Sequence, residues 1–365
     1  MENKKYSLKP GLYLAAAALA GILIMFLSLA NLQTGSHSPI KVQRESYLLG
    51  TIVRVTLYGD DGEKLDKAIS RAMDEIERLE NLLSVNISSS DVSLVNRASG
   101  DHPVKVSEET GFLVEKALEW SERTGGAFDP TVGGIVKLWG IGTKKAGIPD
   151  PVLLQRALAL TDFRKVLVLH EKGATFIKTA KGQKIDLGGI AKGYVTDKVK
   201  ELLIKEGISS ALIDLGGNIA VMGSSPKSAK WKLGLQHPFM PRGEYFGIAE
   251  VSDVSVVTSG PYERYFESNG VKYHHIFDPV TGYPSQSDLN SVTIISENST
   301  DADALSTALF VMGLDKSISI LHKLKNIEAV LVARKPQGTI VYVTQKFRNS
   351  FVLKDPEMKI GPAVQ

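Results

Sequence analysis

The spacing of apolar residues along the chain predicts both helices and strands. Within residues 62–85, one apolar face of a helix is formed by Leu65, Ile69, Ala72, Ile76, Leu79 and Leu83. A second helix is expected to start at a Ser107 cap, to run through Trp120, and to end at the pair Gly125 and Gly126. Strands are predicted where short β-branched or apolar runs occur, at residues 47–59, 165–170, 210–214, 231–236 and 291–296.

These elements predict a mixed protein of the α+β class. No proline-rich linker or run of charge interrupts residues 45–355, so we expect one compact catalytic domain there, followed by a tail at 356–365. Hydrophobic residues make up 43% of the chain, which is enough for a sizeable core. The pentapeptide IDLGG occurs twice, at 185–189 and 213–217, and suggests an internal duplication.

The N-terminal part has a different pattern. Residues 11–30, GLYLAAAALAGILIMFLSLA, carry no charge, and a helix of that length spans about 30 Å of hydrocarbon. Three lysines precede this segment, so the positive-inside rule places the rest of the chain on the extracytoplasmic side of the cell membrane. We expect residues 1–32 to be a signal or membrane anchor and residues 33–44 a tether. The long apolar run favours a retained anchor over cleavage near Ala30.

Charge and cysteine content exclude several functional classes. A net charge of +3, from 43 basic and 40 acidic residues, is too small to indicate a nucleic-acid partner. No basic block with interleaved aromatic residues is present either. The absence of cysteine excludes a disulfide, a thiol nucleophile, a thiolate metal site and a lipid-modified N-terminal cysteine.

The two IDLGG copies are followed by different patterns. After the first copy, apolar residues recur at helical spacing up to Gly207, so the Gly188 and Gly189 pair should open a helix. A helix N-terminus binds phosphate through free N–H groups, and Lys192 would add a positive charge. The second copy leads into the strand-like NIAVMG and should form a tight turn. The residues alone leave open whether the first copy is a phosphate site or a structural turn.

A second candidate site lies in the segment TDADALSTALFVMG, residues 300–313. This segment is predicted to be a helix, and Asp303 and Thr307 are four residues apart, so they share one face. Two oxygen ligands on one turn suit Mg²⁺, which leaves positions for water and phosphate oxygens. The alternative is that Asp301 or Ser299 caps the helix and that Thr307 only packs.

A third candidate is the sequence YHHIFDPVTGYP at residues 273–284. Pro279, Gly282 and Pro284 predict a turn after a short strand. His275 can transfer protons near neutral pH, so it is a candidate general base or positioning residue. The alternative is a structural histidine.

Taken together, these segments make the sequence resemble the ApbE family of FAD:protein FMN transferases. The resemblance covers roughly residues 45–345. It rests on an ordered series of segments: LSVN (83–86), GGAFDPTVGG (125–134), LWGIG (138–142), IDLGGIAKGY (185–194), IDLGGN (213–218), TSGPYERYF (258–266), HHIFDPVTGYP (274–284) and DADALSTALF (301–310).

The resemblance implies roles for individual residues. His275 occupies the position of the catalytic histidine of the family. The implied Mg²⁺ ligands are the carbonyl of Ala191 and the side chains of Asp303 and Thr307. The implied flavin contacts are Leu49, Asn86, Ala127, Phe128, Asp129, Gly188, Lys192, Tyr194, Ile276 and Phe277. The first IDLGG copy would belong to the FAD and metal site, and the second to the supporting core.

The resemblance also implies a reaction. FAD would be the substrate, and FMN would pass to a threonine or serine of a membrane or secreted redox protein through a phosphoester bond, with release of AMP. This protein flavinylation would be Mg²⁺-dependent. Two alternatives stay open: a Mg²⁺-dependent FAD pyrophosphatase, and a non-catalytic flavin-binding protein. Many members of the family attach to the membrane through a lipidated cysteine, which this chain lacks, so the N-terminal helix is expected to provide the attachment.

Overall fold

The fold is described by a computed structural model of residues 38–364. The predicted anchor and residues 33–37 of the predicted tether therefore lie outside the described residues, whereas residues 40–44 of that tether belong to the first strand of the central sheet. Within residues 38–364, no helix combines the length and apolar character needed to cross a bilayer. The expectation of an N-terminal membrane segment stays a prediction.

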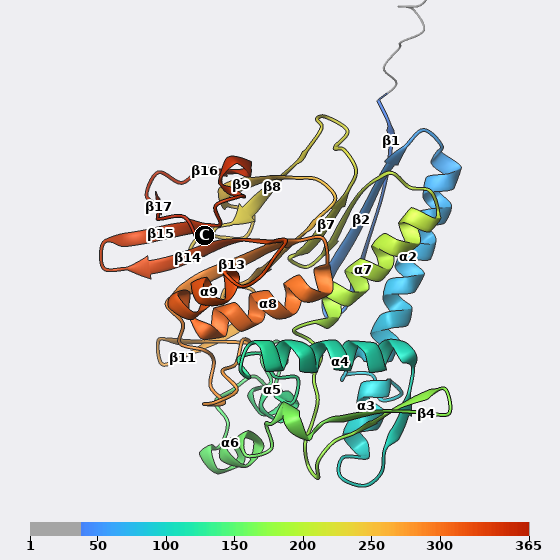
Figure 1. The fold of residues 1–365 in the computed structure, drawn as a ribbon, viewed down its shortest axis with the longest axis vertical. Helices are drawn as coiled ribbons and strands as arrows, with labels where there is room; N and C mark the ends of the chain where they lie inside the picture. The colour runs from blue at the N-terminus through green and yellow to red at the C-terminus, as the bar shows by residue number, and fades with distance from the viewer. Residues whose placement is uncertain (1–37, 365) are drawn as a thin grey trace, which may run out of the picture. The chain divides into compact units, whose positions relative to one another are not determined.

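A nine-stranded sheet forms the centre of the fold (Figure 1). Neighbouring strands are antiparallel except β15 and β17, which run parallel. In spatial order the strands are β1 (Ile40–Leu48), β2 (Thr51–Gly59), β6 (Ser210–Leu215), β7 (Asn218–Met222), β10 (Ser255–Ser259), β13 (Leu289–Ser296), β14 (Ile327–Lys335), β15 (Gly338–Val343) and β17 (Lys359–Ile360).

Three smaller sheets complete the β structure. One contains β3 (Val104–Val106), β5 (Ala174–Lys178) and β4 (Leu167–Glu171). Another contains β16 (Phe351–Leu353), β9 (Tyr245–Val251) and β8 (Trp231–Gln236). The third is a hairpin of β11 (Tyr265–Ser268) and β12 (Val271–His274).

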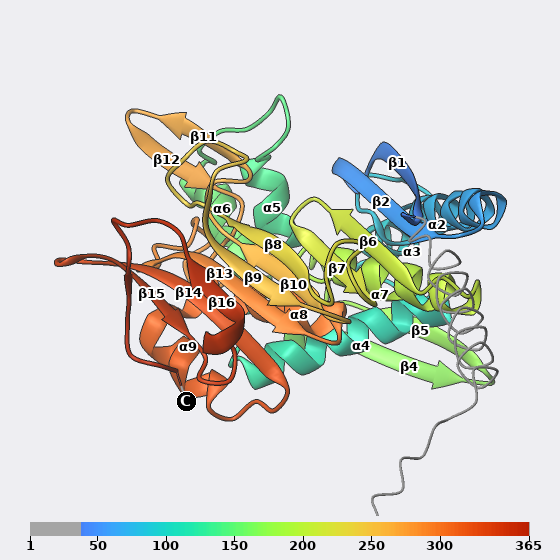
Figure 2. The ribbon, with the colours of Figure 1, turned by 90° about the horizontal axis from the view of Figure 1, so that it is seen from above.

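Eight α-helices lie within residues 38–364. They are α2 (Gly62–Leu83), α3 (Asp91–Arg97), α4 (Glu108–Arg123), α5 (Gly133–Trp139), α6 (Pro151–Leu158), α7 (Ala191–Lys205), α8 (Ser299–Met312) and α9 (Leu314–Leu321), with short 3-10 helices η1 (Phe163–Lys165) and η2 (Arg348–Ser350). Helices α2, α7 and α8 cover one face of the central sheet, and α4 lies beyond α8 (Figure 2).

Each face of the central sheet buries its own hydrophobic cluster. Successive strand residues point to opposite faces, and β10 and β13 follow this rule. Val257 and Ile294 pack in the cluster beneath the helices, whereas Val256 and Ile295 pack against the β8–β9–β16 sheet. Burial on both faces explains why these strands read as continuous apolar runs in the sequence.

The structure confirms the fold class and both early helices. Asp61 caps α2 by accepting the Lys64 N–H, and the predicted cap Ser107 accepts the Thr110 N–H at the start of α4. The segment predicted as one strand, residues 47–59, is instead a hairpin. Leu49 and Gly50 have φ values of 55° and 67° and turn the chain between β1 and β2. The predicted strand at 165–170 starts at Leu167, because η1 occupies residues 163–165.

The two IDLGG copies fold differently, so the repeat does not mark a duplicated structural unit. The second copy ends β6 and turns at Gly216 and Gly217, both with positive φ, where Asp214 Oδ1 accepts both glycine N–H groups. The first copy is a loop before α7 because its backbone has no neighbouring strand, and the Asp186 N–H bonds to the Pro130 carbonyl.

Candidate functional site

Two helices, α7 and α8, cap each other where they meet. The Gly193 N–H, in the first turn of α7, donates to Asp303 Oδ2 of α8 at 2.9 Å. In return, Asp197 of α7 accepts the Ser299 and Thr300 N–H groups at the start of α8, at 2.9 and 2.8 Å. The Thr300 hydroxyl also donates to Asp197 at 2.6 Å. Each helix thus satisfies free N–H groups of the other with a carboxylate, which the helix dipoles favour.

Close approach of the two helices requires a glycine in α7. A Cβ atom added to Gly193 would lie 2.3 Å from the Ser299 carbonyl oxygen and 2.8 Å from Asp303 Cβ. No side chain fits at those distances. The glycine of the segment IAKG is therefore explained by helix packing, which brings the start of α7 against Asp303.

Buried and half-buried oxygen atoms gather at this crossing. Asp303 and Thr307 lie one turn apart on α8, as their spacing predicts. The Oγ atom of Ser259, at the end of β10, is 2.9 Å from Ser306 Oγ and 3.5 Å from Thr307 Oγ1. The first IDLGG loop also reaches this point, since a Cβ on Gly189 would be 3.6 Å from Thr307 Oγ1 and 3.0 Å from the Phe128 ring.

Lys192 balances the charge of the buried carboxylate. Its Nζ atom is 3.5 Å from Asp303 Oδ1, and the two side chains are 25% and 5% exposed. Asp303 uses its other oxygen for Gly193, so Oδ1 is the atom that faces the lysine. The site thus pairs a carboxylate with a partly exposed ammonium group, which is suited to an anionic ligand.

The residues at this crossing fit a Mg²⁺ site. The available donors are a carboxylate of Asp303, a hydroxyl of Thr307 and the carbonyl of Ala191, the first residue of α7 and two residues before Gly193, whose N–H bonds to Asp303. All three are hard oxygen donors, and Mg²⁺ typically takes few of these from the protein. No group of three or more His, Cys, Asp or Glu side chains is placed to hold a metal among residues 38–364. A Mg²⁺ ion here would therefore rely on this mixed donor set.

His275 presents one nitrogen as a base. The carbonyl of Arg264 accepts the His275 backbone N–H at 3.2 Å and lies 3.2 Å from His275 Nδ1. Because a carbonyl only accepts, we assign the ring proton to Nδ1, which leaves the lone pair on Nε2. Burial, together with the positive charges of Arg264 and Lys192, lowers the pKa of His275 to about 3. The ring is thus neutral at physiological pH.

Asp129 accepts hydrogen bonds from its own loop and from the 3-10 helix η1. Its carboxylate accepts the Thr131 N–H at 2.7 Å, the Thr131 hydroxyl at 2.6 Å and the Phe163 N–H at 3.1 Å. Burial raises the pKa of this carboxyl group, and these hydrogen bonds oppose the rise. The loop holds Phe128 against Gly189, so Phe128 is close to the α8 oxygens. The flavin contacts predicted for Ala127, Phe128 and Asp129 stay predictions.

Other predicted flavin contacts lie in several environments. Leu49 is half-buried at the tip of the β1–β2 hairpin, Asn86 is exposed after α2, and Gly188 is exposed in the first IDLGG loop. Ile276 and Phe277 are buried next to His275 in the sequence. Two surface cavities of about 280 Å³ lie elsewhere and include none of the predicted site residues in their walls.

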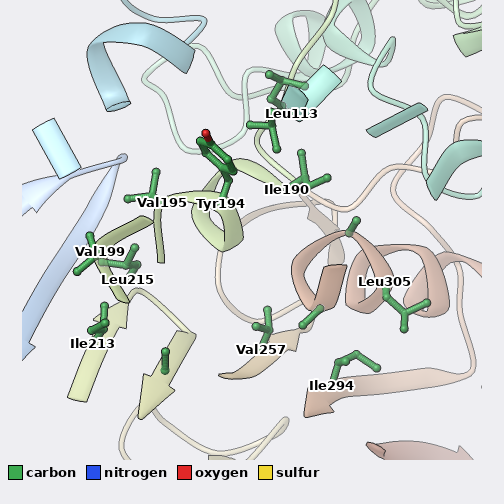
Figure 3. Close-up of a cluster of buried hydrophobic side chains, with 14 of the residues drawn as sticks. Leu113, Ile190, Tyr194, Val195, Val199, Ile213, Leu215, Val257, Ile294 and Leu305 are labelled. Carbon is green, nitrogen blue, oxygen red and sulfur yellow. The ribbon is translucent and has the colours of Figure 1, made fainter. Parts of the chain in front are cut away.

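Tyr194 lies in the hydrophobic core. Its ring is 3% exposed and its centroid is 5.8 Å from that of Phe112 in α4. Figure 3 shows Tyr194 on α7 among apolar side chains such as Val195 and Leu113. The flavin contact predicted for Tyr194 stays a prediction, and the packing explains the residue independently.

Three residues that support the site did not stand out in the sequence. They are Asp197, Arg264 and Asn218. The Oδ1 atom of Asn218 accepts the Thr196 hydroxyl at 3.0 Å and the Ser299 hydroxyl at 2.7 Å. Asn218 is fully buried and follows the second IDLGG copy. Through Asn218, the second IDLGG copy therefore supports the α7–α8 crossing. A polar residue at the start of a buried strand was the sequence feature that could have identified Asn218.

Comparison with known proteins finds close relatives of this chain. The ApbE family profile matches residues 49–331. An FAD:protein FMN transferase of Treponema pallidum is 37% identical over 325 residues, which are 86% of this chain and 90% of that protein. A Klebsiella pneumoniae protein of the same name is 38% identical over 303 residues, covering 83% and 92% of the two chains.

Solved structures agree with these sequence matches. The ApbE protein of Thermotoga maritima is 32% identical with a TM-score of 0.76, and the alignment covers 85% of this chain and 99% of that one. The flavin transferase ApbE of Vibrio cholerae is 27% identical with a TM-score of 0.73, covering 86% and 99%. Most of the described fold thus resembles that of these proteins.

Replacing Asp197 by alanine should destabilise the protein strongly. Two backbone N–H groups and a hydroxyl at the start of α8 would lose their acceptor, and unfolding free energy should fall by roughly 2–4 kcal/mol. Asp61→Ala is the matched control, because Asp61 caps the exposed start of α2 and its loss should cost about 1 kcal/mol. Urea unfolding of both variants measures the difference. Equal losses of unfolding free energy in the two variants would show that the α7–α8 cap stabilises the protein no more than an ordinary exposed helix cap.

Proposed function

The chain belongs to the ApbE family and acts as an FAD:protein FMN transferase, and from this premise we propose that it uses Mg²⁺ to join FMN to a Thr or Ser hydroxyl of a target redox protein. The bond formed would be a phosphoester, and AMP would be the second product. The observation that carries the proposal is the α7–α8 crossing, where Asp303 lies beside Lys192 and Thr307 follows Asp303 by one turn of α8.

Charge and proton position support phosphoryl-group transfer at this site. Lys192 offers a partly exposed ammonium group to a pyrophosphate, and the start of α7 adds the positive end of a helix dipole. His275 is neutral and has Nε2 free to take a proton. The positive charges of Arg264 and Lys192 both lower the pKa of His275.

In the proposed transfer of FMN, the acceptor hydroxyl loses its proton to His275 Nε2. At the same time, its oxygen bonds to the phosphorus on the flavin side of the FAD pyrophosphate. The bond from that phosphorus to the bridging oxygen breaks, and AMP leaves with that oxygen. Lys192 stabilises charge on the phosphate oxygens. Mg²⁺, when bound by Asp303, Thr307 and the Ala191 carbonyl, would neutralise part of the pyrophosphate charge.

We further propose that residues 1–32 tether the domain to the cell membrane with the active site on the extracytoplasmic side. Support comes from the charge-free segment 11–30 and the lysines before it. A redox protein with its flavin-accepting residue on that side would be within reach of the tethered domain.

Replacing Asp303 by asparagine should remove Mg²⁺-dependent turnover while the fold is kept. Asparagine is isosteric and retains an oxygen for the Gly193 N–H, but it lacks the negative charge a cation needs. We expect transfer to fall by at least about 10²-fold, since a bound cation contributes several kcal/mol of charge stabilisation. The increase in melting temperature on adding Mg²⁺ should also disappear, which is a readout independent of activity.

Asp301→Asn is the matched control for this variant, because Asp301 lies two residues away on α8 and accepts the Trp120 Nε1–H instead. This control should keep both its activity and its response to Mg²⁺. Wild-type turnover in Asp303→Asn would rule out Asp303 as a metal ligand.

Replacing His275 by alanine should slow transfer and leave FAD binding intact. The side chain supplies the proposed base, and its Nδ1 bonds to the same Arg264 carbonyl that the His275 backbone N–H also reaches, so the fold should persist without it. General base catalysis is typically worth about 10²–10⁴-fold, and we expect a loss of kcat of that order. Single-turnover transfer and FAD titration by fluorescence measure the two effects. An unchanged rate would remove His275 from the mechanism.

A further inference from the structure

The tip of the β1–β2 hairpin has a strained backbone held by a distant arginine. Leu49 has φ of 55° and Gly50 has φ of 67°, so a leucine occupies the left-handed region that favours glycine. The Arg264 Nη2–H donates to the Gly50 carbonyl at 3.0 Å. Strain of this kind persists where surrounding contacts impose it, and it gathers at functional sites.

The backbone of the same arginine holds His275. The β11–β12 hairpin pairs Tyr265 with His274, so Arg264 and His275 are the next residues beyond that pair. At this position the Arg264 carbonyl accepts the His275 backbone N–H and the Nδ1–H, both at 3.2 Å. One residue thus contacts the β1–β2 tip through its side chain and the candidate base through its main chain.

The guanidinium group also acts on His275 through its charge. After burial, the charge of Arg264 lowers the pKa of His275, whereas the hydrogen bond to the Arg264 carbonyl raises it; the charges of Lys192 and His274 lower it further. Burial lowers the pKa of His274 as well. The Arg264 side chain is exposed, so its charge can be removed without opening a cavity in the core.

We propose that Arg264 is a positioning residue that couples the β1–β2 tip to the base of the transfer reaction. Its guanidinium fixes the turn at Leu49 and Gly50, and its carbonyl fixes the tautomer of His275 with Nε2 free. The inference rests on the proposed function, in which His275 accepts the proton, and on the flavin contact that the family resemblance implies for Leu49.

The test compares Arg264→Met with Arg264→Lys in the full-length protein. Methionine removes both the donor to Gly50 and the charge. We expect the KM for FAD to rise about tenfold, as for loss of a charged hydrogen bond. We also expect the acid limb of the kcat/KM profile to move to higher pH, because His275 loses a neighbouring positive charge. Lysine keeps a charge and a donor and should restore both properties substantially.

Arg242→Met is the matched control, since Arg242 is exposed in the turn between β8 and β9. It should leave the KM, the pH profile and the melting temperature unchanged. An Arg264→Met protein with wild-type KM and an unshifted acid limb would overturn the proposal. A lowered melting temperature with an unshifted acid limb would also overturn it, because that result indicates a purely structural role.

His275→Ala separates this inference from the proposed function. If His275→Ala transfers FMN at the wild-type rate, the proposed base is wrong and the coupling through Arg264 falls with it. If His275→Ala is inactive and Arg264→Met behaves as wild type, the proposed function stands and only the role of Arg264 is refuted.

Discussion

The site depends on the reciprocal capping of α7 and α8. Asp303 binds the start of α7 through Gly193, and Asp197 binds the start of α8 through Ser299 and Thr300. Because both contacts are charge-assisted and largely buried, the two helix ends have one preferred arrangement. The same carboxylate that anchors α7 turns its second oxygen toward Lys192. Asp303 therefore serves both the packing of the two helices and the proposed chemistry.

In the proposed reaction, the charges around this crossing would act on the pyrophosphate of FAD. Lys192 and Arg264 both influence His275, and burial keeps that ring neutral in the folded protein. A pyrophosphate would bring negative charge and so raise the pKa of His275 from its value in the free enzyme. The base would therefore become stronger when FAD is bound, which ties proton transfer to the presence of substrate. This arrangement suits an enzyme better than a protein that only stores flavin.

The sequence predicted local features well and distant contacts poorly. Helical spacing correctly placed Asp303 and Thr307 on one face, and the glycines after the second IDLGG copy correctly predicted a tight turn. The hairpin within residues 47–59 was missed because Leu49 adopts a conformation that leucine rarely takes, and its partner Arg264 is far away in the chain. Asp197 was missed for the same reason, since its function depends on a helix that begins about a hundred residues later. Contacts of this kind are set by topology and leave no local pattern.

The proposed transfer of FMN to a protein hydroxyl is best tested by intact-mass analysis of an acceptor domain that carries a flavinylation-type threonine. The acceptor is incubated with the full-length protein, FAD and Mg²⁺, and released nucleotides are separated by chromatography. We expect the acceptor to gain one FMN for each AMP released, and EDTA to stop both the attachment and the release. An acceptor with alanine in place of the threonine should gain no FMN. AMP and free FMN with no labelled acceptor would contradict the proposed transfer and indicate a pyrophosphatase. FAD bound without any product would contradict it in favour of a flavin-binding protein.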